Sequence, residues 1–152
     1  MFSGAGTTMA PHVIRINAGE DIKRRIVSVL HGRRAVVLLS AIGSISAASI
    51  RSSSSTGSVT YEGHFDMVNL SGSYINDPAD GLSGGLNVTF AGSDGRLIGG
   101  PVDGLLIAAT PVQVIVGVLV PSSSSSAKPK AKDNYSSEGG FTESQNLAPW
   151  QS

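Results

Sequence analysis

The apolar positions near the start of the chain change their period once. In residues 12–17, apolar and polar side chains alternate after Val13, the pattern of a half-buried strand. Residues 20–31 instead place apolar side chains at i, i+4, i+7 and i+8, one face of a helix, and these are Ile22, Ile26, Val29 and Leu30. Gly32 follows and suits a helix C-terminus. The pattern predicts one strand and then one helix.

Beyond Gly32, apolar runs alternate with turn-forming residues as far as residue 120. The runs that predict strands are 33–41, 45–51, 59–70, 86–91, 96–98, 102–109 and 112–120. The Ser-rich residues 52–58 and the polar stretch 76–84 predict loops, and Asp94-Gly95 predicts a hairpin turn. The chain is therefore expected to be rich in β-structure and to contain a single helix.

The composition divides the chain into three parts. Residues 1–10 are small and are expected to be flexible, residues 11–120 form the folded domain, and residues 121–152 form a disordered tail containing serines and lysines. The apolar stretch 105–120 is shorter than the ~20 residues of a membrane-spanning helix and is interpreted as strands. No membrane contact is expected.

Charge and cysteine content exclude several classes of protein. The chain has 11 basic and 11 acidic residues, so it lacks the overall basic character of an autonomous nucleic-acid binder. The basic residues around the helix are interpreted as a solvated helix face; they are Lys23, Arg24, Arg25, Arg33 and Arg34. With no cysteine, disulfides and thiolate metal sites are excluded.

No pattern of catalytic residues stands out. The three histidines, His12, His31 and His64, lack the short spacing typical of zinc ligands, and we expect neither a metal site nor a cofactor. Glu62 and Asp66 flank His64, which would suit acid–base chemistry, but exposed charges on a strand are the plainer interpretation. The sequence contains no nucleophile elbow, phosphate-binding glycine loop or His-Glu-x-x-His motif, so we do not expect an enzyme.

The last two predicted strands are apolar on both faces, and one helix covers only part of a sheet. Either a second sheet layer in a monomer or a neighbouring subunit must cover the rest. The pattern leaves both open. If subunits assemble, the expected interface residues are Leu105, Ile107, Val112, Val114, Val116 and Val118.

Several motifs in order resemble the plant and prokaryote conserved (PPC) domain of the plant AT-hook motif nuclear-localised proteins. They include Pro11-His12-Val13-Ile14, Leu39-Ser40-Ala41-Ile42-Gly43-Ser44-Ile45-Ser46, Asp94-Gly95-Arg96-Leu97-Ile98-Gly99-Gly100 and Gly104-Leu105-Leu106-Ile107-Ala108-Ala109-Thr110-Pro111-Val112-Gln113-Val114. The resemblance covers about residues 11–120. It implies an α+β fold, mainly an antiparallel β-sheet with one α-helix packed on it, assembled as a homotrimer or as mixed trimers with paralogues.

The resemblance also implies a function. The family's proteins are nuclear, bind the minor groove of AT-rich DNA through AT-hooks, and recruit transcription factors or chromatin proteins through a six-residue loop. The matching positions here are Gly63, His64, Phe65, Asp66, Met67 and Val68, where His64 and Asp66 replace Arg and Glu. We expect Phe65 to anchor partners.

Two points of the resemblance stay open. The chain contains no Arg-Gly-Arg-Pro core of an AT-hook, and we expect the hook to lie upstream of Met1. The alternative function is a trimeric β-protein of the prokaryotic kind that binds a small molecule or a metal.

Overall fold

A computed structural model of the protein describes residues 7–54 and 57–121. Its elements are β1 (Thr7–Ile16), α1 (Ile22–Ser28), β2 (Ala35–Ile42), β3 (Ser44–Arg51), β4 (Ser58–Asp77), β5 (Gly81–Ala91), β6 (Leu97–Ala108) and β7 (Val112–Pro121). Residues 9–119 form one compact unit. The predicted tail lies almost wholly outside the described residues. The flexible segment predicted for residues 1–10 is too long, because β1 already begins at Thr7.

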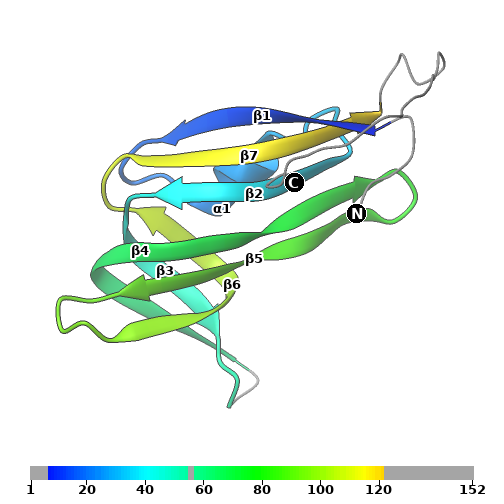
Figure 1. The fold of residues 1–152 in the computed structure, drawn as a ribbon. Helices are drawn as coiled ribbons and strands as arrows, with labels where there is room; N and C mark the ends of the chain where they lie inside the picture. Colours follow the sequence, from blue (N-terminus) through cyan, green and yellow to red (C-terminus); the bar gives the residue numbers. More distant parts are fainter. Residues whose placement is uncertain (1–6, 55–56, 122–152) are drawn as a thin grey trace, which may run out of the picture. The chain divides into compact units, whose positions relative to one another are not determined.

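The strands form one seven-stranded sheet in the order β1-β7-β2-β4-β3-β6-β5, with a further pairing of β4 with β5 (Figure 1). Each pairing whose register is defined is antiparallel, so the predicted mainly antiparallel sheet with one helix is confirmed. β4 is 20 residues long, and its first part pairs with β3 while its second part pairs with β5. Because β5 pairs with β6 and β6 pairs with β3, these four strands form a closed ladder.

The helix is shorter than the predicted range 20–31. The Asp21 carboxylate accepts a hydrogen bond from the Arg24 amide at 3.2 Å and caps α1, so Asp21 itself is extended. The chain leaves α1 after Ser28, and Gly32 has a φ of +74° in the turn beyond it. The predicted apolar face is otherwise correct, since Ile22, Ile26 and Leu30 are buried and Val29 is half-buried.

The apolar core continues from α1 onto one face of β7 and β2, and the helix lies behind these two strands in Figure 1. On β7 the buried side chains recur at every second residue and are Val112, Val114, Val116 and Val118. Two of them pair with buried residues of β2, Val118 with Val36 and Val116 with Leu38. The period of two places these valines on the face that α1 covers.

Two glycine-containing stretches expected to lie outside strands, residues 76–84 and 99–101, lie partly or wholly inside them. β4 continues through Gly63 and Gly72, β5 begins at Gly81, and β6 runs through residues 99–101. At Gly72 a Cβ atom would meet the carbonyl oxygen of Gly85. Two strands approach closely here because the side chain is absent, so glycine permits the ladder that its turn propensity seemed to forbid.

Candidate protein-interaction surface

The segment of residues 63–68, which the family resemblance singles out, is not a loop. It lies within β4, where the pairing changes from β3 to β5: Asp66 is opposite Ser44 on one side and Ala91 on the other. The β3–β4 and β4–β5 registers both shift nearby, as β-bulges do. The predicted loop is therefore wrong, because backbone pairing on the two sides holds this segment in an extended conformation.

Phe65 is packed against the chain's own aromatic residues. Its ring centroid lies 5.0 Å from that of Phe90, which in turn lies 5.7 Å from Tyr61. Phe90 is fully buried and Phe65 is half-buried. A Cβ atom at Gly63 would come within 3.2 Å of the Phe65 ring, so glycine leaves room for it. Only part of the Phe65 side chain is therefore accessible to a partner.

The residues that alternate with Phe65 and Met67 form the outward side of the segment. His64, Asp66 and Val68 are exposed, whereas Met67 is only 8% exposed. The Asp66 carboxylate accepts a hydrogen bond from the Ser44 hydroxyl at 3.3 Å, which holds it beside β3. Glu62 is exposed as well, which agrees with the interpretation of Glu62 and Asp66 as exposed charges on a strand. We call His64, Asp66 and Val68 the β4 surface.

The six residues expected at a subunit interface differ in their exposure. Val112, Val114, Val116 and Val118 are at most 1% exposed within a single chain, so they have no surface to offer a second one. Only Leu105 is well exposed, and Ile107 is half-buried. Their assignment to an interface is corrected for the four valines, because α1 and the neighbouring strands already cover them.

A group of exposed apolar side chains lies on the opposite face of β1, β7 and β2. Met9 and Leu39 both lie beside Gly117, so they share its face of the sheet. Ile42 pairs with Gln113, which is on the same face, and Val13 follows Met9 at even spacing along β1. We call this set the outer apolar face; its members are Met9, Val13, Leu39, Ile42 and the half-buried Ile115. The sequence pattern did not reveal this face, because its members come from three strands that are distant along the chain.

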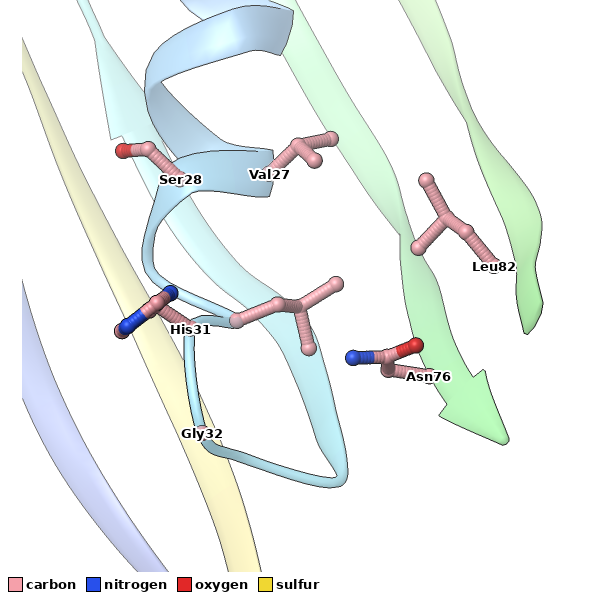
Figure 2. Close-up of a pocket in the computed structure, with 7 residues that line it drawn as sticks. Val27, Ser28, His31, Gly32, Asn76 and Leu82 are labelled. Atoms are coloured by element: carbon pink, nitrogen blue, oxygen red, sulfur yellow. The ribbon is translucent and has the colours of Figure 1, made fainter. Parts of the chain in front are cut away.

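Two open depressions flank the C-terminal end of α1. One, of about 500 Å³, is lined by Val27, Leu30, Asn76 and Leu82 among others and contains no Lys, Arg, Asp or Glu (Figure 2). His31 belongs to its rim, but Figure 2 shows the imidazole directed away from Asn76 and Leu82. The other depression, between β1 and α1, includes His12 and His31.

The histidines do not form a metal-binding cluster. Among the described residues no group of three or more His, Asp and Glu side chains is placed to hold a metal ion, and His64 lies on β4, away from the depression that His12 and His31 share. In the same residues, no helix combines the length and apolar character that crossing a membrane requires.

Together, the seven-stranded sheet, the single helix and the closed ladder define a known class of domain. The model of the Plants and Prokaryotes Conserved (PCC) domain matches residues 3–120, and the chain belongs to this family. This is the PPC family that the sequence motifs resemble.

Among its relatives is the AT-hook motif nuclear-localized protein 7 of Arabidopsis thaliana, with 50% identity over 121 residues. That match covers 76% of this chain and 38% of the relative, so the chain spans well under half the length of that protein. The family assignment therefore concerns the domain.

Solved structures share the fold at low sequence identity. The PPC protein of Pyrococcus horikoshii superposes with a TM-score of 0.60 at 12% identity, covering 91% of this chain and 92% of that one. The metal-containing protein AF0104 of Archaeoglobus fulgidus gives a TM-score of 0.57 at 22% identity, covering 74% and 81% of the two chains. At such identities these structures establish the fold alone.

Proposed function

We propose that the chain is a non-catalytic oligomerisation and protein-recruitment domain of a nuclear AT-hook regulator of transcription or chromatin. The whole protein would bind AT-rich DNA through AT-hooks that are not in this sequence. The observation that carries the proposal is the outer apolar face, which lies on a domain whose curated relatives are named for AT-hooks and nuclear localisation.

The outer apolar face supports self-assembly. Four large apolar side chains on two strands are between 48% and 72% exposed, and they are Met9, Val13, Leu39 and Ile42. Contiguous apolar surface of this kind usually marks a contact site. In a cyclic trimer, each of the three chains would bury its outer apolar face, and three AT-hooks would be brought together. Linking weak DNA contacts in this way raises avidity by ~10² or more without any new contact.

Introducing charge on the outer apolar face should dissociate the assembly. In the double variant Leu39→Glu/Ile42→Glu, assembly would remove two carboxylates from water. The free-energy cost of this desolvation far exceeds the free energy gained at the interface. We expect the mass from light scattering to fall from that of three chains to that of one.

The matched control is Val59→Glu/Leu97→Glu, which changes two exposed apolar residues outside this face. It should leave the mass unchanged. Unaltered protein that stays a single-chain particle at every concentration would contradict the proposed assembly.

The β4 surface supports protein recruitment. It presents an exposed apolar residue, Val68, beside two side chains able to form charged or hydrogen-bonded contacts, His64 and Asp66. The half-buried Phe65 stiffens the segment from behind through its contact with Phe90. A rigid backbone loses little conformational entropy on binding, which favours recognition by a partner.

Substituting Val68 with Asp should weaken partner binding at least tenfold, because it places an unpaired carboxylate in the contact. Deleting residues 63–68 is unsuitable, since it would remove the centre of β4 and disrupt two ladders. Val59→Asp on the same strand is the control, as Val59 is also exposed. Quantitative comparison of nuclear proteins retained by the full-length variants measures the effect, and equal retention by both would rule out the role of Val68.

The alternative is a domain that binds a metal or small molecule. Two observations are in its favour: His12 and His31 line the same depression, and a protein of the same fold is described as metal-containing. Elemental analysis of the purified protein decides between the two, since a stoichiometric ion would favour the alternative.

A further inference from the structure

Charge is distributed unevenly along the folded part of the chain. Residues 7–34 contain six Lys and Arg residues and two acidic residues, a formal charge of +4. Residues 35–121 contain two Arg residues and six acidic residues, a formal charge of −4. The zero net charge that argues against nucleic-acid binding therefore hides a strongly basic N-terminal segment. This segment is β1, α1 and the turn after it.

Much of this positive charge gathers around one depression. A cleft of about 530 Å³ lies between β1 and α1, and we call it the basic cleft. Its polar lining residues are His12, Arg15, Arg25, Ser28, His31 and Arg33; the other three are Val13, Ile14 and Val29. The lining thus includes three arginines and two histidines and no Asp or Glu.

Two of the three arginines are anchored by the backbone. Arg25 donates from Nη2 to the Arg15 carbonyl at 2.8 Å, and its Nε lies 3.6 Å from a carboxylate oxygen of Glu20. Arg33 donates from Nη1 to the Val29 carbonyl at 3.4 Å. Each guanidinium has five N–H donors, so both keep donors for a ligand. The Arg15, His12 and His31 side chains make no hydrogen bond or ion pair with any residue in the described ranges.

The backbone of β1 adds donors to the same cleft. β1 is at the end of the sheet order, with β7 as its neighbour. The Arg15 carbonyl faces α1, because it accepts the bond from Arg25. In an extended strand the N–H and C=O groups of one residue point to the same side of the strand. The N–H and C=O groups of residues i and i+2 therefore point to the same side as well. The amides of Arg15 and Val13 therefore also face away from β7, toward the open edge.

We propose that the basic cleft binds backbone phosphates of duplex DNA. Fixed guanidiniums and backbone amides are donors that phosphate oxygens accept from in protein–DNA interfaces. The lining has no Phe, Tyr or Trp side chain on which an unpaired base could stack, which favours a duplex over a single strand. Lys23 and Arg24 are further basic residues on α1.

This proposal is independent of the AT-hooks and of assembly. It assigns DNA contact to the domain itself, with no sequence preference, because phosphate contacts position a protein without reading bases. In a whole protein the contact would orient the domain on the DNA that the hooks had bound. A test on this chain alone therefore separates it from the proposed function.

The experiment measures binding of the complete 152-residue chain to a fluorescent mixed-sequence duplex of 20 base pairs, by anisotropy, between 20 and 200 mM NaCl. We expect the variant Arg15→Gln/Arg33→Gln to bind about tenfold more weakly at low salt. Its plot of log affinity against log salt should be shallower by about two units, one for each lost phosphate contact. Arg25 stays unchanged because it also holds β1 and Glu20 together.

Arg51→Gln/Arg96→Gln is the matched control. It removes the same charge from two arginines that pair with Asp103 and Asp94, away from the cleft. Identical affinities and salt slopes for the two variants would overturn the proposal, as would absence of duplex binding by unaltered protein at 20 mM NaCl. Light scattering on each sample excludes a change of assembly as the cause of weaker binding.

Inorganic phosphate distinguishes a DNA site from a site for the free ion. Added at 5 mM with NaCl adjusted to constant ionic strength, it should displace less than half of the bound duplex. Phosphate that displaced all of it at this concentration would overturn the assignment to DNA and make the cleft a free-phosphate site.

Discussion

Replacing Phe90 with alanine is expected to lower the free energy of unfolding by about 3–5 kcal/mol. The ring is fully buried and touches Tyr61 and Phe65, both on β4, from its place on β5. The cavity would stay open, since the closed ladder of β3, β4, β5 and β6 limits how far the strands can move together. Urea unfolding followed by circular dichroism measures the loss.

Two comparisons make the Phe90 result specific. Phe65→Ala should cost clearly less, because Phe65 is already half-exposed in the folded chain. Leu97→Ala, at a site that is 64% exposed, should change stability by under about 0.5 kcal/mol. A Phe90→Ala variant as stable as Leu97→Ala would show that this ring is not part of the core.

Substituting Gly72 with alanine is expected to cost about 2–5 kcal/mol. The backbone there has a φ of +133°, which an L side chain rarely adopts, and the new Cβ would meet the Gly85 carbonyl oxygen across the β4–β5 ladder. The rigid contact is with backbone, so relief requires the two strands to separate. The cost combines a strained dihedral of about 1–2 kcal/mol with overpacking of about 1–3 kcal/mol. Thermal unfolding measures it.

Gly85→Ala is the control for Gly72. Gly85 lies in the same ladder, opposite Ser73, but nothing lies within 4 Å of a Cβ atom built on it and its φ is not positive. Stability should be nearly unchanged or slightly higher, because alanine restricts the unfolded chain more than glycine does. Equal losses at positions 72 and 85 would indicate that the close approach of the strands is not what selects glycine.

Local periodicity predicted the parts of the fold that depend on local geometry. The face of α1 with Ile22 and Ile26 and the apolar run of β7 both appear in the structure. Strand ends were less predictable at glycines. Gly63 and Gly72 have positive φ yet stay in β4. The strand continues through them because the residues around them pair with β3 or β5. No local pattern reveals such a partner.

The interaction residues were only partly predictable for the same reason. The four even-numbered valines of β7 were assigned to an interface because the elements that cover them, α1 and β2, are distant from β7 in the sequence. The outward position of Ile42, opposite Gln113, follows from a register shift in β2 between Leu38 and Ser40, which a period of two does not anticipate. The basic cleft likewise joins Arg15 to Arg33 across 18 positions, so a charge total could not reveal it.

The end strand β1 bears on how far an assembly of these chains can grow. An unpaired strand edge is a template for another strand, and stacking of edges leads to open-ended ribbons. Here Arg25 occupies the outward carbonyl of Arg15, and a carboxylate oxygen of Glu20 accepts from the outward amide of Asn17 at 2.8 Å. An incoming strand would have to displace both charged side chains. In the proposed assembly, this edge would oppose the addition of further chains by strand pairing and so would oppose growth into fibres.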